Sequence, residues 1–214
     1  MTSARHHVTD SPTTAATSRR ALLRGGLALG AAVTTAAATA HTAVGAPGAL
    51  PGPADYPPIE FIPAHSSNYS SAGRPSDNPI AFVVIHVTQG GYAGTISHFQ
   101  NAGANSSAHY VLRSRDGHLA QMVREKDIAW HAGNWDYNTR SIGIEHEGFI
   151  DDPKWFTEAM YRSSAKLTAA ICDKYAIPRE RSRIIGHHEV PGATHTDPGK
   201  HWNWDLYMRL VAEA

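Results

Sequence analysis

The segment Ile80–Ile85 constrains the fold most, because six apolar residues stand in a row and four of them branch at Cβ. Such a run is typical of a β-strand covered on both faces, as in a parallel or mixed sheet that lies between helices. The strand delivers His86 and Thr88 to its end, and the pair Gly90–Gly91 that follows predicts a turn. We therefore expect a sheet whose strand ends carry polar side chains.

Strand and helix patterns alternate along the rest of the chain. The patterns predict further strands at 107–113, 119–123, 141–145 and 183–186, and helices at 95–101, 157–175 and 204–212. In the longest helix Met160, Leu167 and Ile171 share one face, and Thr157 can cap its beginning. This alternation predicts an α/β fold: a single domain with a central mixed β-sheet flanked by helices.

The first 40 residues have the composition of a signal peptide. Arg19 and Arg20 are followed by leucines and then by an apolar stretch rich in alanine, glycine and threonine, with small residues at 38–40. The paired arginines resemble a twin-arginine signal, which implies a bacterial protein exported in a folded state. Arg24 interrupts the stretch, and its composition is too weakly apolar for a membrane span. We expect a secreted protein without a stable membrane anchor.

Prolines and small polar residues dominate residues 41–77. Such a composition cannot build a packed core by itself, so it predicts a proline-rich linker or N-terminal extension. Within it, Ile59, Phe61 and Ile62 are apolar enough to lie along the folded part. The folded domain is expected at 78–214, which is long enough for one hydrophobic core.

Composition excludes several classes of function. Residues 41–214 carry 15 basic and 18 acidic side chains, so the body of the protein lacks the positive charge that nucleic-acid binding requires. The single cysteine, Cys172, excludes an intramolecular disulfide and a thiolate-rich zinc site. The 14 histidines are the unusual feature, because histidine is the commonest metal ligand in proteins.

Polar side chains follow three of the predicted strands. His86, Glu145 and His187 stand at strand ends, where ligands bind in open α/β sheets, and Asp197 comes ten residues after His187. Two imidazoles and a carboxylate with one open position would make a catalytic zinc site. The spacing does not form a short zinc motif, however, and a single strand-end histidine is more often a hydrogen-bonded surface residue. Spacing alone leaves both interpretations open.

Six short strings occur in a fixed order along the chain: Ile85–Thr88, Ser107–Tyr110, Ala129–Gly133, Ser141–Glu145, Gly186–Val190 and Thr196–Gly199. Together they resemble the type-2 N-acetylmuramoyl-L-alanine amidases, the zinc family that also includes the peptidoglycan recognition proteins. The likeness runs from about Ile80 to Trp204. It implies a zinc-dependent amidase that cleaves between the lactyl group of N-acetylmuramic acid and the L-alanine of the stem peptide.

The resemblance also implies roles for individual residues. His86, His187 and Asp197 match the three ligands of one zinc ion per chain. Glu145 falls on the acid that the aspartate-ligand branch of the family uses in catalysis. His195 stands where many members carry a catalytic lysine, and this departure leaves its role less well defined than that of the ligands.

Amide hydrolysis at neutral pH needs a strong nucleophile and a way to carry charge on the carbonyl oxygen, and zinc supplies both. A carboxylate near the attacking water can accept its proton and deliver it to the leaving amine. We expect Glu145 in this role because a strand would hold it rigidly, with Glu147 as the competing acid. His195, as an imidazolium, could stabilise the oxyanion.

Three further residues are expected to contact substrate, each with a simpler alternative. His109 could face the site, where it would contact substrate or support Glu145, or it could be a strand-surface residue. Trp130 and His131 precede a Gly-Asn loop, so they could contact glycan or peptide or could pack locally.

The leading hypothesis is therefore an exported, monomeric peptidoglycan hydrolase whose partners are peptidoglycan and muropeptides. A non-catalytic peptidoglycan-binding module is the first alternative, but all three ligand positions are filled here. A zinc hydrolase of another acyl-amide, such as an anhydro-muropeptide, is the second. Export argues against it, because the intact wall lies outside the cell.

Overall fold

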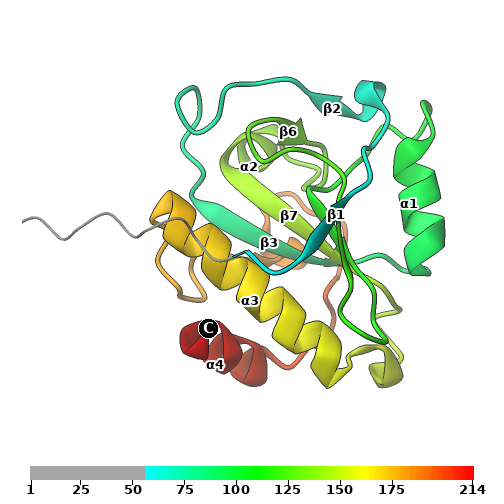
Figure 1. The fold of residues 1–214 in the computed structure, drawn as a ribbon, viewed down its shortest axis with the longest axis vertical. Helices are drawn as coiled ribbons and strands as arrows, with labels where there is room; N and C mark the ends of the chain where they lie inside the picture. The colour runs from blue at the N-terminus through cyan, green and yellow to red at the C-terminus, as the bar shows by residue number, and fades with distance from the viewer. Residues whose placement is uncertain (1–55) are drawn as a thin grey trace, which may run out of the picture. The chain divides into compact units, whose positions relative to one another are not determined.

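A mixed β-sheet of six strands lies at the centre of residues 56–214, the part of the chain that this computed structural model describes (Figure 1). Its order is β1-β5-β4-β7-β3-β8, and only the β4–β5 pair is antiparallel. The strands are β1 (Ile59–Phe61), β3 (Phe82–Val87), β4 (Tyr110–Leu112), β5 (Leu119–Gln121), β7 (Ser141–His146) and β8 (Ile184–Gly186). The expected central mixed sheet is thus confirmed.

Strand β3 is buried along its whole length, as its sequence predicts. Its side chains alternate between two cores. Val83 and Ile85 belong to the core that contains the long C-terminal helices, whereas Phe82 and Val84 belong to a second core on the opposite face. Because side chains of a strand repeat every two residues, His86 lies on the second face, away from those helices.

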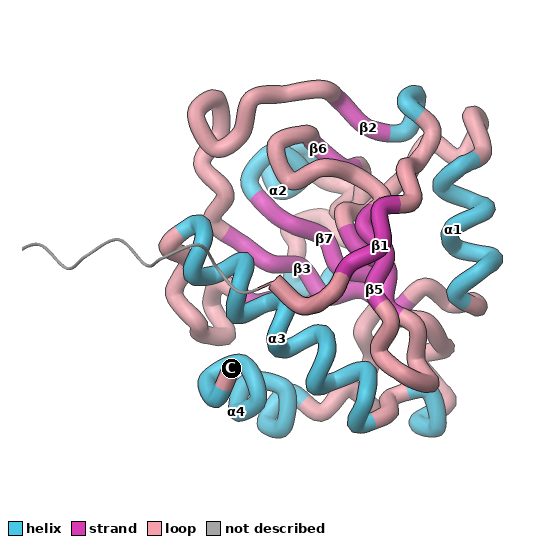
Figure 2. Tube along the Cα trace, in the orientation of Figure 1, coloured by secondary structure: helices cyan, strands magenta, loops and turns pink. Residues whose placement is uncertain are grey.

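Helices α3 (Glu158–Tyr175) and α4 (Trp204–Glu213) pack against each other and against one face of the sheet (Figure 1). The predicted cap of α3 is confirmed, because Thr157 Oγ1 accepts a hydrogen bond of 3.2 Å from the Met160 amide. Helix α1 (Tyr92–Gln100) lies apart from α3 and α4 in Figure 2, and its Phe99 packs in a third cluster that includes Val111 of β4. The flanking of the sheet by helices is therefore as predicted.

Among the strands and α-helices, four short elements were not expected: β1, the antiparallel pair β2 (Tyr69–Ser70) and β6 (Ile128–Ala129), and helix α2 (Trp135–Arg140). They contain two to six residues each, too few for a periodic pattern to stand out. None of the helices that the structure describes is long and apolar enough to cross a membrane.

Residues 56–77 pack onto the domain expected at 78–214, so the ordered part of the chain begins before residue 78. Strand β1 pairs in parallel with β5, and Ala64 and Arg74 are buried. The Tyr56 hydroxyl donates a hydrogen bond of 2.8 Å to the Glu125 carboxylate. A proline-rich segment has no core of its own, but it can be ordered by a core that another segment supplies. The expected signal peptide at 1–40 and residues 41–55 lie outside the described residues.

Arg74 joins this N-terminal segment to the centre of the protein. Its side chain is buried, and its guanidinium donates to five backbone carbonyls, those of Glu125, Asp127, Asn138, Thr139 and Ser141. Burial lowers the pKa of Arg74 to about 10, so the group stays charged at neutral pH. One side chain therefore holds the β5–β6 connection, α2 and the start of β7 in fixed relation.

Replacing Arg74 by alanine should lower the free energy of unfolding by roughly 3–5 kcal/mol, because buried carbonyls would lose a charged donor. Urea denaturation followed by circular dichroism measures this change. Arg115→Ala is the matched control, since its side chain is 76% exposed, and it should change stability by less than about 0.5 kcal/mol. Equal effects of the two changes would contradict the assigned role of Arg74.

Candidate active site

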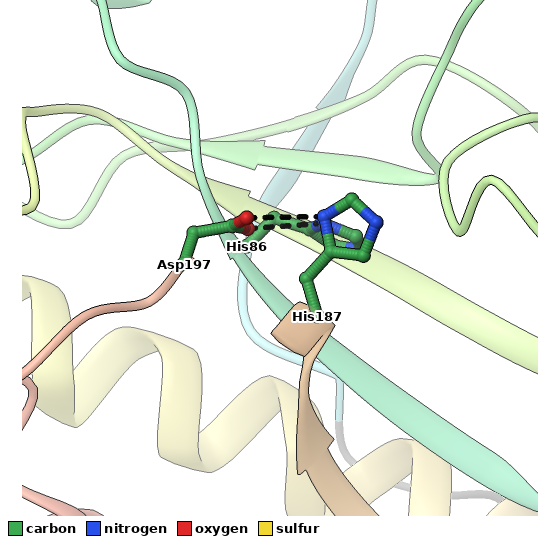
Figure 3. A group of neighbouring side chains, drawn as sticks. All are labelled: His86, His187 and Asp197. Atoms are coloured by element: carbon green, nitrogen blue, oxygen red, sulfur yellow. Dashed lines mark hydrogen bonds and ion pairs between the residues drawn. The ribbon is translucent and has the colours of Figure 1, made fainter. Parts of the chain in front are cut away.

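Two buried histidines point the same nitrogen, Nδ1, at one carboxylate (Figure 3). His86 Nδ1 lies 3.3 Å from Asp197 Oδ2, and His187 Nδ1 lies 3.1 Å from Asp197 Oδ1. One potential ligand atom from each of the three residues lies within 4.8 Å of the others. The structure thus brings together the three residues that the sequence predicted as ligands.

Sheet topology explains why His86 and His187 meet although a hundred residues separate them. Strand β8 lies beside β3 in parallel, with Ile85 opposite Gly186, so the residues that follow these two positions emerge side by side. The carboxylate of Asp197 comes from a loop and accepts a hydrogen bond of 3.3 Å from the Val87 amide at the end of β3. Three segments therefore converge where β3 and β8 end.

His188 fixes the loop that carries the third residue of the cluster. Its backbone amide and its Nδ1 both bond to the Asp197 carbonyl oxygen, at 3.1 and 3.0 Å. The ring of His188 is exposed and turned toward the backbone of Asp197, so it supports that residue from outside the cluster.

The donor set fits a zinc ion. Two ligands that each lie about 2.0–2.2 Å from a tetrahedral ion stand roughly 3.3–3.5 Å apart, close to the two separations between imidazole and carboxylate here. Two imidazoles and one carboxylate also match the ligand types of catalytic zinc sites, which keep one position open.

Charge in the cluster is balanced locally. Burial opposes ionisation of Asp197, but the neighbouring imidazoles of His187 and His86 outweigh it and hold the pKa of the carboxyl well below its ordinary value. Burial lowers the pKa of His86, and the negative charge of Asp197 offsets this in part. An ionised carboxylate next to two imidazole nitrogens is a set of donors that a divalent cation can bind.

Glu145 stands beside the cluster because β7 is the other neighbour of β3, and the parallel register places Glu145 directly opposite His86. Its Oε2 atom is buried and has no hydrogen-bond partner among the described residues. Burial, together with the negative charge of Asp197, raises the pKa of Glu145 to about 8. A carboxyl group whose pKa lies this close to neutral pH can both accept and release a proton in a reaction.

The cluster and Glu145 open into one cavity of about 710 Å³, a size suited to a small ligand or a segment of a polymer. The predicted site residues that line it are His86, Trp130, His131, Glu145, His187, His195 and Asp197. His195 is exposed, and its ring stacks on that of His187 with centroids 4.6 Å apart. Backbone and side chains of α1, among them Thr95 and His98, form another part of the wall.

His109 requires a correction, because it does not line this cavity and is fully buried. Its Nδ1 accepts a hydrogen bond of 3.0 Å from the Gly143 amide, and its Nε2 lies 2.7 Å from Arg74 Nη2 and 3.2 Å from the Asp127 carbonyl oxygen. Burial and the charge of Arg74 hold the pKa of His109 well below its usual value. The expected substrate contact is replaced by a role in the interior.

The competing acid Glu147 is also engaged elsewhere. Its two carboxylate oxygens accept hydrogen bonds from the amides of Tyr92 and Ser114, at 2.9 and 2.8 Å. The first of these bonds satisfies an amide at the start of α1, where a negative charge is favourable. Glu147 therefore orders the chain around β7, and Glu145 is the acid that faces the cavity.

Trp130 and His131, expected together at the substrate, lie differently. Trp130 is half-buried in the cavity wall, and its Nε1 donates to Ser70 Oγ at 3.1 Å, which leaves the ring face available to a ligand. His131 is buried, and both of its nitrogens face protein atoms: Nδ1 lies 2.9 Å from His86 Nε2, and Nε2 lies 3.1 Å from Ser141 Oγ. His131 thus contacts a predicted metal ligand and also lines the cavity, and its expected contact with substrate stays a prediction.

Two residues outside the predicted set of site residues support His131. The side chain of Asn138 accepts hydrogen bonds from the amides of His131 and Ala132, at 3.0 and 2.8 Å. Gly143 is needed for close approach, because a Cβ at this position would lie 2.5 Å from His131 Cγ. Neither contact leaves a local signal in the sequence, since each joins residues that meet only in the folded chain.

An open mixed sheet with a buried His–His–Asp cluster and a carboxylate in the same cavity is the arrangement of a metal-dependent hydrolase. The family model described as N-acetylmuramoyl-L-alanine amidase matches residues 76–200. The chain therefore belongs to the N-acetylmuramoyl-L-alanine amidase family and is an amide hydrolase of that type.

Similar proteins agree with this assignment. N-acetylmuramoyl-L-alanine amidase A of Achromobacter lyticus is 40% identical over 174 residues, which are 73% of this chain and 95% of that protein. The 1,6-anhydro-N-acetylmuramyl-L-alanine amidase AmpD of Haemophilus influenzae is 37% identical over 112 residues, 49% of this chain and 58% of the relative. A solved structure of AmpD matches with a TM-score of 0.60 at 28% identity and covers 72% of this chain and 94% of its own.

Proposed function

We propose that the protein is an exported, zinc-dependent peptidoglycan hydrolase that cleaves the amide bond between N-acetylmuramic acid and L-alanine. The observation that carries this proposal is the convergence of His86, His187, Asp197 and Glu145 in one cavity. The name of the Achromobacter relative, whose length the chain covers almost completely, supports the substrate.

His86, His187 and Asp197 would hold the zinc ion. Bound there, zinc would polarise the carbonyl of the scissile amide and lower the pKa of a water molecule. The protein's own contribution is to hold the two imidazoles and the carboxylate rigidly at the ends of adjacent strands. Burial of all three keeps bulk water away and strengthens each electrostatic interaction in the site.

Glu145 would move the proton in this reaction. Its Oε2 has no partner among the described residues, so it is free to accept a proton from the attacking water and to return it to the nitrogen of the leaving L-alanine. The neighbouring strand β3 fixes its backbone opposite His86, so its distance from the cluster is set by the sheet register.

His195 and Trp130 would act on the substrate from the cavity wall. The imidazole of His195 stacks on His187 and is exposed, so it can donate a hydrogen bond to the carbonyl oxygen as negative charge develops there. The ring of Trp130 offers an apolar face to sugar or peptide.

Two variants should show that metal binding and catalysis depend on different residues. His187→Ala should lose bound zinc, because two remaining ligands cannot enforce the geometry. Glu145→Gln should keep one zinc per chain and lose about 10²–10⁴-fold in turnover of a muropeptide, since it removes the proton acceptor. Elemental analysis of the purified chain and a release assay for L-alanyl peptides measure the two effects.

His118→Ala is the matched control, because this histidine does not line the cavity and contacts Glu60 at the surface; it should keep both zinc and turnover. His195→Ala should keep zinc and lose roughly 10²-fold in turnover. Full zinc content in His187→Ala, or near-normal turnover in Glu145→Gln, would contradict the assigned roles.

Export would depend on the paired arginines near the beginning of the chain, which lie outside the described residues. Arg19 and Arg20 fit a twin-arginine signal, and a peptidoglycan hydrolase needs access to the wall. Changing both to lysine should leave uncleaved precursor in the cytoplasm of an expressing bacterium, as seen by fractionation and immunoblotting. Unchanged secretion would show that another route carries the protein.

A further inference from the structure

We infer that His131 is a positioning residue for the first metal ligand: it fixes the proton of His86 on Nε2 and so leaves Nδ1 free to bind zinc. The inference rests on the proposed zinc site and extends it to a residue outside the set of three predicted ligands. It is carried by a row of hydrogen bonds that runs from a backbone carbonyl to the cluster.

The Tyr137 carbonyl at the end of this row determines which atom donates in each hydrogen bond. The Tyr137 carbonyl oxygen can only accept, so the Ser141 hydroxyl, 2.5 Å away, must donate to it. The Ser141 oxygen then accepts from the nearest nitrogen, His131 Nε2 at 3.1 Å, which must carry a proton. A neutral imidazole holds one proton, so His131 Nδ1 is left as an acceptor.

The next hydrogen bond determines which nitrogen of His86 carries the proton. His131 Nδ1 lies 2.9 Å from His86 Nε2, and since Nδ1 accepts, His86 Nε2 must be the protonated nitrogen. His86 Nδ1 is then unprotonated and faces Asp197 Oδ2 at 3.3 Å. Two lone pairs that face each other at this distance repel, and a cation held between them would relieve this repulsion.

The opposite tautomer of His86 would lower the affinity for the metal ion. With its proton on Nδ1, the ring would donate a hydrogen bond to Asp197, and Nδ1 would have no lone pair for a metal ion. Binding zinc would then require a tautomer change and the loss of that bond. By stabilising the proton on Nε2, His131 removes this competing state before the metal arrives, which is how a partner of a histidine ligand raises metal affinity.

The position of the His131 ring is itself constrained from several sides. Asn138 holds its backbone through two hydrogen bonds, and Gly143 leaves the space that the ring fills. The ring is 9% exposed, so water does not replace His131 Nδ1 as the partner of His86.

The second histidine ligand has no comparable partner. His187 Nε2 is buried without a hydrogen-bond partner among the described residues, and its ring rests on His195. The two imidazoles of the cluster are therefore not equivalent. His131 orients the ring of His86 before the metal binds, and this contact should account for a measurable share of the zinc affinity.

Two substitutions at position 131 test this on the purified 214-residue chain. His131→Phe keeps a ring but removes the acceptor, whereas His131→Asn places an amide oxygen near the position of Nδ1. Chelator competition should show that His131→Phe weakens zinc binding by about 10–100-fold and that His131→Asn stays within about threefold of the original chain. His118→Phe and His118→Asn, at the protein surface, should both bind zinc normally.

The proton on His86 can be observed directly without metal. Long-range ¹H–¹⁵N correlation spectra of the zinc-free chain, with His86→Asn used to assign the signal, should show the Nε2-protonated tautomer in the original protein and a mixture in His131→Phe. This measurement does not depend on activity, and in the original protein it needs no substitution in the row of hydrogen bonds.

The possible outcomes separate this inference from the proposed function. A chain that binds no zinc at all would overturn the zinc site, while a His86 protonated on Nδ1 would overturn the role of His131. Equal zinc affinity of the folded His131→Phe variant and the original chain would also overturn it. Weakening in both His131→Phe and His131→Asn would mean that ring packing, and not the acceptor, is what matters, and would overturn the inference as stated.

Discussion

The carboxylate of Asp197, shared between two buried imidazole nitrogens, is the interaction on which the rest of the site depends. An ionised group inside a protein is costly unless it is paired, and here each oxygen faces a different histidine. The parallel strands β3 and β8 bring those histidines side by side, and the amide of Val87 bonds to the carboxylate. The ends of these strands thus form a site that suits a cation, and Glu145 on the neighbouring strand β7 lies beside it, where the proposed mechanism uses it as the base.

The sequence predicted the parts of the site that strand ends and family motifs define. His86, Glu145 and His187 follow or end apolar strands, and topology alone brings such positions to one edge of the sheet. His109 and His131 could not be placed in this way. Both sit in motifs of the family, but what decides their roles is contact with Arg74 and with Ser141, and these contacts arise only when distant segments pack together.

The fold was predicted where long periodic segments carried it, as in β3 and α3. It was not predicted for residues 56–77, whose composition indicates only that they lack a core of their own. Arg74 shows why: its neighbours Gly73 and Pro75 indicate a turn, and nothing nearby reveals that its guanidinium bonds to five carbonyls of the domain. The same side chain fixes the start of β7, and through Ser141 it supports the row of hydrogen bonds that ends at His86.

The central claim is that the His–His–Asp cluster makes this chain a peptidoglycan amidase. Mass spectrometry of purified peptidoglycan digested with the chain tests it most directly, because the products identify the bond that is cut. The account predicts free stem peptides beginning with L-alanine and glycan strands with intact lactyl groups, no products after treatment with a chelator, and recovery on adding zinc. Intact peptidoglycan in the presence of zinc, or the same products in the presence of chelator, would contradict it.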